Sequence, residues 1–494
     1  MYQPVSHMNQ QLLLPGDFFL SFGGSLNENN RWVKLTQLVP WAYVDKKYAK
    51  SFRNSFRGQK AVSIRMALGS LIIQERLQLS DRDTVEQITE SRYLQYFIDG
   101  FQLDPPFHHL LMTHFRKRLS EKMMREVNEI LAIEAAKEAS RDHEDGGDGP
   151  KSSSREKRKR KADHEDDPNQ GVLLLDATCA PSDVAYPTDL NLLNEAREKL
   201  EGIIDTMHAP VVGQEKKPRT YRQKARKAFL AVSKQRRAGI RVIRKAVGQQ
   251  LRYVRRNLQI IELLAQKQSL TGLSRKQYRD LLVIQELYRQ QRQMYDRRTH
   301  QMEDRIVSIS QPHVRPMVRG KAKARVEFGA KVSASLVNGY AFLQRQSWNS
   351  FNEGVTLIES LETYKARFGV YPKAVLADQI YRTREKRAFC KAHGIRLSGP
   401  ALGRPSKGEQ ATEQRRLVKQ DSGERNAIEG KFGEGKRKYG LGRIRARLAA
   451  TSETVIALQF LVMNLERKLR VLFAFWMNWL YSAFREQRQL KISI

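Results

Sequence analysis

Three acidic residues have the types and positions that phosphodiester chemistry requires. Asp176 ends the apolar run from Val172 to Leu175, and Asp378 ends the run from Ala374 to Ala377. Short continuous apolar runs predict buried strands. Carboxylates at adjacent strand ends can hold divalent metal ions, and Glu429 is the candidate for a third ligand. An aspartate at a strand end is also a common turn former or helix cap, so the pair alone leaves both interpretations open.

The surroundings of Glu429 favour the chemical interpretation. Arg425, Glu429 and Lys436 are four and seven residues apart, which places them close to one face of a helix. A carboxylate between these two cations suits a metal ligand flanked by phosphate-binding groups. Three glycines between residues 430 and 435 weaken this helix by about 1 kcal/mol each, and close approach of a DNA backbone would explain them. The alternative is a solvated charged helix with chance spacing.

Together these motifs resemble the DDE transposases of insertion sequences, in the four-and-five group. The third-carboxylate motif of that family reads Tyr, two residues, Arg, three residues, Glu, six residues, Lys. Arg425, Glu429 and Lys436 match this spacing, whereas Ser422 stands at the tyrosine position. Glu424 and Glu434 are nearby acids without that spacing. The stretches 175–178 and 376–381 resemble the two aspartate regions, and 328–331 with the hairpin after it resembles the second and third strands.

The resemblance implies a specific activity. It implies a ribonuclease-H-like core in which Asp176, Asp378 and Glu429 are the catalytic residues and the ligands of two Mg²⁺ ions, with Mn²⁺ able to substitute. It also implies cleavage and strand transfer at the inverted-repeat ends of an element. Arg425 and Lys436 would position phosphates. Because two ends must be cut together, we expect at least a homodimer when DNA is bound.

Composition agrees with a polyanionic partner. The formal charge is +35 and the pI is near 10.2, which points to nucleic acid or an anionic membrane surface. The apolar stretch from Val471 to Phe484 is shorter than the roughly 20 residues that span a bilayer, and we expect it to pack on the body of the protein. No secretory signal is visible, and Cys179 and Cys390 suit reduced thiols. Neither zinc-ligand spacing nor a phosphate-binding Gly-rich loop occurs. The expected location is cytoplasmic, on the nucleoid when DNA is bound, with double-stranded DNA as partner and no membrane.

The fold class predicted is α/β, with a ribonuclease-H-like mixed sheet, a large helical insertion after the first strand and an all-helical N-terminal domain. The predicted parts are an N-terminal extension (1–60), a helical DNA-binding domain (61–138), a disordered charged linker (139–169), a catalytic domain (170–472) with a basic helical insertion (190–304), and an apolar and basic tail (473–494).

The N-terminal domain is predicted from helical spacing. Apolar residues from Ile64 to Ile72 form one stripe, and Asp83 with Glu86 resembles a capping box that opens a second helix. A third helix is predicted across 111–127. Its basic side carries candidate DNA contacts at Arg116, Lys117 and Arg118. A helix-turn-helix DNA binder and a helical bundle with a solvated charged face both fit this pattern.

The insertion follows from spacing. The first two acids, at 176 and 378, are 202 residues apart, whereas 378 and 429 are 51 apart, so the surplus lies after the first strand. Between residues 214 and 260 there are 16 Lys or Arg and one acid, Glu215. We expect this basic face to bind phosphates and the apolar stripe to mediate dimerisation, with DNA contact as the leading role because of the excess of positive charge. The candidate contacts are Arg236, Arg237, Arg244 and Lys245.

The remaining elements are simpler. A capped helix is predicted from Ser274, a strand at 305–309, a hairpin turning at Asn338–Gly339, and helices at 384–393 and 452–472. Asp183 and Asp189 are predicted to be loop or cap residues. Lys331, on the hairpin, either binds DNA phosphates near the metal site or is an ordinary edge lysine. Two other functions remain open: a metal-dependent nuclease without strand transfer, and a non-catalytic DNA-binding relative.

Overall fold

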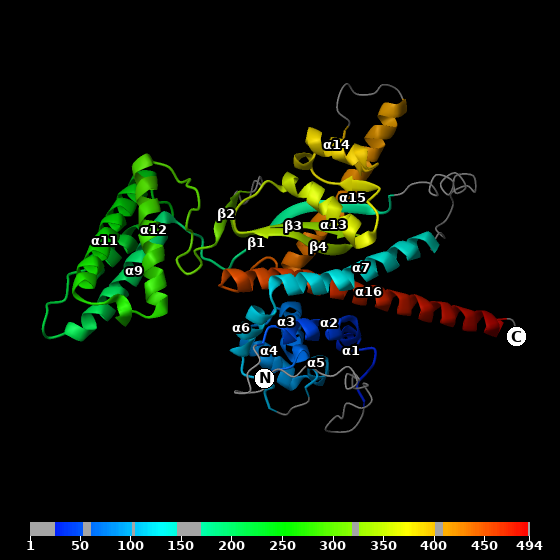
Figure 1. The fold of residues 1–494 in the computed structure, drawn as a ribbon, viewed down its shortest axis with the longest axis horizontal. Helices are drawn as coiled ribbons and strands as arrows, with labels where there is room; N and C mark the ends of the chain where they lie inside the picture. The colour runs from blue at the N-terminus through cyan, green and yellow to red at the C-terminus, as the bar shows by residue number, and fades with distance from the viewer. Residues whose placement is uncertain are drawn as a thin grey trace.

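The computed structural model describes residues 25–52, 61–100, 104–145, 169–318, 326–400 and 409–492. The N-terminal part is helical (Figure 1). Its helices are α1 (Arg31–Leu38), α2 (Trp41–Ala49), α3 (Ile64–Leu77), α4 (Asp81–Glu90), α5 (Arg92–Ile98), α6 (Leu111–Arg118) and α7 (Glu121–Asp145). Their apolar faces share one core that also includes residues of the sheet and of the C-terminal helix α16 (Ala449–Ile492).

Two local predictions in this part are wrong. The capping box of α4 uses Ser80 and Asp83, because Ser80 takes the N-cap position three residues before Asp83. The predicted third helix is broken between α6 and α7, where the Ser120 hydroxyl accepts a hydrogen bond from the Met123 amide at 3.4 Å and starts a new helix. Helix α7 then runs to Asp145, into the segment predicted as linker, whose residues 146–168 lie outside the described part.

A mixed sheet forms the centre of the protein. Its strands are β1 (Val172–Pro181), β2 (Arg315–Val318), β3 (Val326–Val337), β4 (Tyr340–Ser347), β5 (Ala374–Leu376) and β6 (Arg396–Leu397). They lie in the order β2-β3-β1-β5-β6, with β4 also paired to β3. The central strand β1 is antiparallel to β3 and parallel to β5, and β5 is parallel to β6. This arrangement confirms the predicted ribonuclease-H-like α/β core.

The hairpin between β3 and β4 is confirmed. Asn338 and Gly339 both have positive φ, 48° and 81°, as a two-residue hairpin turn requires. The strand predicted at 305–309 is absent from the described structure. The Ile306 amide instead donates to the Gln290 side chain at 2.9 Å, and Ile306 and Ile309 are buried against the helical insertion. The apolar residues there pack on helices. A short apolar run alone does not show whether its residues pack in this way or form a buried strand.

Helices cover both faces of the sheet because alternate strand residues point to opposite sides. Leu173 and Leu175 of β1 share a core with α7, α13 (Thr356–Phe368) and α14 (Arg384–Ala392). Leu174 faces the core that contains α15 (Glu409–Lys438) and α16. Helices α14 and α16 confirm the predicted helices at 384–393 and 452–472. Figure 1 shows α16 continuing beyond the body of the protein.

The prediction that the stretch from Val471 packs on the body holds only in part where its side chains are described. Phe473 packs against the main core, whereas Leu472, Phe475 and Met477 are exposed, with Phe475 at 55%. The side chains of 478–484 lie outside the described part. None of the described helices is both long enough and apolar enough to cross a membrane.

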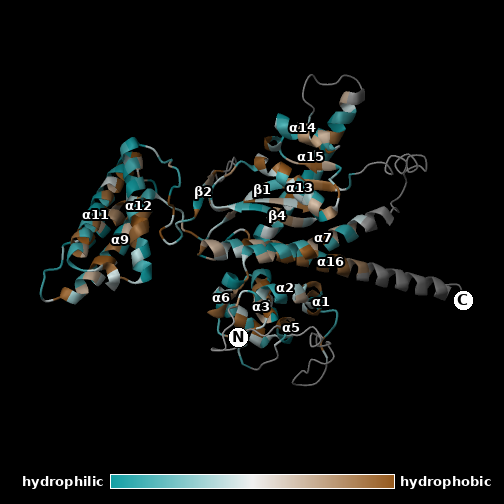
Figure 2. Ribbon diagram, viewed as in Figure 1, coloured by the Kyte–Doolittle hydropathy of each residue, from teal (hydrophilic) through white to brown (hydrophobic). Residues whose placement is uncertain are grey.

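The insertion is a helical bundle with its own core. Its main helices are α9 (Asp189–His208), α10 (Arg222–Ser233), α11 (Ile240–Lys267) and α12 (Arg275–Arg297). The predicted cap of α12 is confirmed, since Ser274 and Gln277 form a complete capping box. Figure 2 shows hydrophobic and hydrophilic residues mixed along these helices, as expected for amphipathic helices. The apolar stripe of α11 is buried inside the bundle through residues such as Leu251 and Val254, so it forms the core of the bundle and is not exposed for the dimerisation contact predicted for it.

Asp189 ties the two ends of the bundle together. Its carboxylate accepts hydrogen bonds from Gln291 of α12 at 2.9 Å and from Arg305, which follows the bundle, at 2.8 Å. It is the first residue of α9, next to the N-cap Thr188. The start and the end of the insertion therefore lie side by side, which lets it extend from the sheet on two neighbouring connections (Figure 1).

Candidate active site

The two aspartates lie at matching positions on neighbouring strands. Strands β1 and β5 are parallel with Leu174 opposite Leu376, and Asp176 and Asp378 each come two residues later. Asp176 is still within β1, opposite Ala334 of β3. Asp378 has left its strand and is the N-cap of a short 3-10 helix (Gln379–Tyr381), with its carboxylate accepting from the Gln379 amide at 2.8 Å. Both carboxylates therefore belong to the same edge of the sheet.

Helix α15 brings the third acid to this edge. The helix packs on β1 and β5 through its buried residues Ile428 and Phe432. On it, Arg425 lies between the acids: its guanidinium is 3.8 Å from an oxygen of Asp378 and 3.6 Å from an oxygen of Glu429. The structure therefore brings together Asp378, Arg425 and Glu429.

Asp176 is partly buried, whereas Asp378 and Glu429 are exposed. Burial raises the pKa of Asp176 to about 6, and the nearby carboxylates of Glu353 and Glu429 add to the rise. The Ala177 amide, which donates to the Asp176 carboxylate at 2.8 Å, and the charge of Arg425 act in the opposite direction. Such a concentration of negative charge in a partly buried place favours a bound cation.

The chemistry of these side chains fits a divalent metal. Carboxylate oxygens are the hard ligands that Mg²⁺ and Mn²⁺ prefer, and two of the three acids already share one cationic partner, Arg425. Within the described ranges no three His, Cys, Asp or Glu side chains are grouped closely enough to hold a metal ion in the present arrangement.

Sequence reasoning missed Glu353. It lies in a short 3-10 helix (Glu353–Val355) that packs against the one following Asp378. Its carboxylate pairs with Lys331 at 2.9 Å, and Lys331 also donates to the Phe351 carbonyl oxygen at 2.8 Å. Glu353 belongs to the site because its charge helps to raise the pKa of Asp176. No spacing in the sequence predicts this effect. The charge of Lys331 is thus already balanced inside the protein.

The other predicted DNA contacts differ in how accessible they are. The Lys436 ammonium is 3.8 Å from the carboxylate of Glu327, near the start of β3. Arg116 is mostly buried and pairs with Asp81, whereas Lys117 and Arg118 are exposed, the latter over the ring of Phe52.

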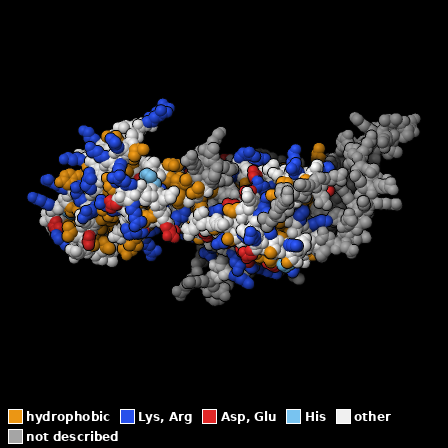
Figure 3. Space-filling model, turned by 90° about the horizontal axis from the view of Figure 1, so that it is seen from above, with side chains coloured by type: hydrophobic (Ala, Val, Ile, Leu, Met, Phe, Trp, Pro, Cys, Tyr) orange, Lys and Arg blue, Asp and Glu red, His pale blue; other side chains and the backbone are white. Residues whose placement is uncertain are grey.

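In the bundle, three of the four predicted contacts are exposed. These are Arg236, Arg237 and Lys245. Arg244 packs over the ring of Tyr295 at 4.2 Å and donates to its carbonyl oxygen at 2.9 Å. Figure 3 shows Lys and Arg side chains over much of the visible face of the bundle.

Two regions of the chain match known protein families. Residues 375–466 match the family described as "Transposase DDE domain", and residues 21–118 match "Transposase domain (DUF772)". A Rhizobium meliloti protein described as "Uncharacterized protein ORF8 in nfe locus" is 27% identical over 177 residues, which are 35% of this chain and 73% of that protein. No solved structure matches the chain significantly. The first match includes the positions of Asp378 and Glu429, and Asp176 precedes it on the paired strand. The two matches, with the mixed sheet and the helical N-terminal part, support a DDE transposase of insertion sequences.

Proposed function

We propose that this protein binds the terminal inverted repeats of its insertion sequence, cleaves DNA at the element ends and joins the 3′-hydroxyl ends to target DNA. One observation carries the proposal. Asp176 and Asp378 occupy equivalent positions on two parallel strands, and Arg425 of α15 links Asp378 to Glu429 at the same edge. Acids so placed around a cation suit phosphodiester chemistry assisted by divalent metal ions.

The residues have separate tasks. Asp176, Asp378 and Glu429 would hold two Mg²⁺ ions, or Mn²⁺ in their place, which would supply Lewis-acid stabilisation and a more acidic attacking hydroxyl. Asp176 must be ionised to act as a ligand, so its raised pKa links the chemistry to pH. Arg425, released from the two acids, is placed to bind the phosphate that approaches them. Lys436 is on the same helix, about two turns beyond Glu429, and would bind a neighbouring phosphate.

The partners follow from charge and from the reaction. Double-stranded DNA is the partner because the chain carries a formal charge of +35. We assign phosphate contacts to the exposed Lys and Arg side chains of the bundle and of α6, which are Arg236, Arg237, Lys245, Lys117 and Arg118. Two ends are cut together, so the active form on DNA is at least a homodimer. We place it in the cytoplasm, on the nucleoid when bound.

The experiment is cleavage of a duplex that carries the element's own ends, with and without Mg²⁺. Asp378→Ala should abolish cleavage while DNA binding persists. Glu424→Ala is the matched control, because Glu424 is an exposed acid on α15 that accepts a hydrogen bond from Gln420 at 2.9 Å. Equal cleavage by wild type and Asp378→Ala would refute the assignment of the site.

Two alternatives are separated by further outcomes. With pre-cleaved ends, joined products support transposition, whereas hydrolysis alone indicates a nuclease with the same core. DNA binding without cleavage by the wild type, under conditions where both ends are present, would indicate a non-catalytic relative. The arrangement of the acids around Arg425 favours the catalytic proposals over the last one.

A further inference from the structure

The end of α15 and the loop after it form a strongly basic segment, residues 436–447. The segment contains six Lys or Arg and no Asp or Glu. Cations in the last helical turn also stabilise the carbonyl end of a helix, which accounts for the three at 436–438. That explanation does not extend to the three in the loop, which are Arg443, Arg445 and Arg447.

The loop is held rigidly beside the end of β1. The Ile444 amide donates to the Pro181 carbonyl oxygen at 2.8 Å, and the Ile444 carbonyl oxygen accepts from the Asp183 amide at 2.9 Å. Ile444 is completely buried and forms a parallel bridge with Ser182. Side chains alternate along an extended backbone, so the arginines on either side of Ile444 point away from this core, and both are exposed.

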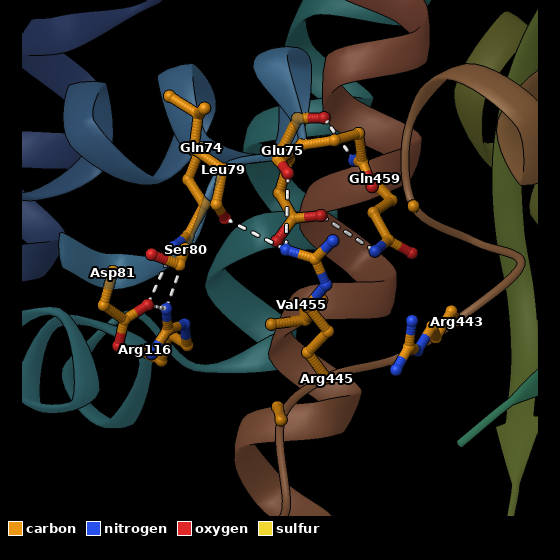
Figure 4. Close-up of a pocket in the computed structure, with 13 residues that line it drawn as sticks. Gln74, Glu75, Leu79, Ser80, Asp81, Arg116, Arg443, Arg445, Val455 and Gln459 are labelled. Atoms are coloured by element: carbon orange, nitrogen blue, oxygen red, sulfur yellow. Dashed lines mark hydrogen bonds and ion pairs between the residues drawn. The ribbon is translucent and has the colours of Figure 1, made fainter. Parts of the chain in front are cut away.

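Two of the arginines line a pocket shared with the N-terminal helices. Arg443 and Arg445 line a cavity of about 240 Å³, into which Arg116 also reaches from α6 (Figure 4). Arg445 donates to the carbonyl oxygens of Gln78 and Leu79, at 3.3 and 3.4 Å. The N-terminal helices and the catalytic core therefore meet at a cluster of guanidinium groups.

Much of this positive charge is open to an outside partner. Arg443 pairs with Asp183 at 2.9 Å, but the two side chains are 68% and 41% exposed. Such exposed pairs contribute about 1 kcal/mol at most, so a phosphate can replace the carboxylate. In the described part of the chain, Arg447 has no carboxylate partner, and it is exposed.

We propose that residues 436–447 hold the phosphate backbone of the element-end duplex between the catalytic acids and the N-terminal helices. This inference rests on the proposed function, which makes that duplex the substrate. Ser182 comes six residues after Asp176 along the chain, about 20 Å at 3.3 Å per residue. That length equals about six base pairs of B-DNA. A duplex cleaved at Asp176 thus passes the basic segment within one helical turn.

The test measures binding apart from chemistry. The full chain carrying Asp378→Ala is titrated onto a labelled duplex of the element end in EDTA, at several salt concentrations. Adding Arg443→Gln and Arg447→Gln should lower the slope of log affinity against log salt by about 2, because each phosphate contact contributes about 0.9. Arg445 stays, which preserves its contacts with Gln78 and Leu79. The matched control replaces Lys365 and Lys391, exposed on α13 and α14 across the sheet, by Gln.

The outcomes separate this inference from the proposed function. A reduced slope in the arginine variant, with the control unchanged and equal melting temperatures, supports it. An unchanged slope overturns it and leaves the proposed function standing, and so does a lower melting temperature with an unchanged slope, which would assign the arginines a structural role. No DNA binding by the parent chain would overturn both.

Discussion

Glu75 offers a quantitative test of the contact between the N-terminal helices and the core. It lies on α3 in the wall of the pocket in Figure 4, 8% exposed, and accepts a hydrogen bond from the Gln459 side chain of α16 at 2.9 Å. Burial raises the pKa of Glu75 from its ordinary 4.5 to about 7, against the opposing effects of Gln459, Arg116 and Arg445, while the Asp81 carboxylate adds to the rise. Between pH 4.5 and 7, Glu75 therefore keeps its proton in the folded protein and loses it in the unfolded chain.

The magnitude follows from the pKa difference. Each tenfold change in proton affinity is worth about 1.4 kcal/mol, so ionised Glu75 lowers the free energy of unfolding by about 3 kcal/mol. Below pH 4.5 both states are protonated and the penalty is absent. As the pH rises from 4.5 to 7 the penalty grows, because the folded state binds the proton more tightly, and above 7 it is complete.

Glu75→Gln should remove this dependence. The new amide keeps the shape of the side chain, and it can donate to the Gln459 Oε1 atom, which is buried without a hydrogen-bond partner in the described structure. We expect the variant to be more stable than wild type by about 3 kcal/mol at pH 8, with the gain shrinking towards zero at pH 4.5. Denaturant unfolding at four pH values measures this.

The control for this experiment is Glu90→Gln, at an exposed acid on α4. It should leave the pH dependence as in wild type. A constant stability difference between Glu75→Gln and wild type from pH 5 to 8 would refute the reasoning, because a buried ionisation cannot be independent of pH.

Three further predictions address the site and the core. Since burial raises the pKa of Asp176 to about 6, Mn²⁺ affinity measured by calorimetry should fall as the pH drops through 6, and Asp176→Asn should remove that step. Asn464→Ala should cost about 3 kcal/mol in chemical denaturation, because buried Asn464 hydrogen-bonds both Asn128 and the backbone of Ala341; an unchanged unfolding midpoint would show that the contact contributes nothing. Gly329→Ala should lower stability by about 2 kcal/mol by forcing β1 and β3 apart, since a Cβ there would overlap the Ala180 carbonyl oxygen; a melting temperature equal to wild type would contradict this.

Strand ends and turns were predictable because their signals are local. The apolar runs before Asp176 and Asp378 are the buried strands β1 and β5, and Asn338–Gly339 needs positive φ at both residues, which few pairs tolerate. The spacing of the acids located the insertion, because a sheet needs its second and third strands soon after the first unless something intervenes.

Long-range contacts were not predictable. The influence of Glu353 on Asp176 depends on two short 3-10 helices that pack only in the folded chain. The apolar residues at 306–309 pack on helices rather than in the sheet, and their local pattern is the same in both cases. The partner of Lys331, which decides whether its charge is available, is 22 residues away at Glu353.

The bond between Asp189 and Arg305 has a consequence for the order of folding. Pro181 of β1 pairs with Gly329 of β3, 148 residues later in the chain. Closing so long a loop costs entropy. The cost falls once the helices of the bundle have folded and the Arg305 guanidinium donates to the Asp189 carboxylate at 2.8 Å, because the chain between these two residues is then already closed. We therefore expect the bundle to fold first during synthesis, before β3 can join β1. Until then β1 keeps an unpaired edge, so a bundle that folds slowly would leave the nascent chain prone to aggregation.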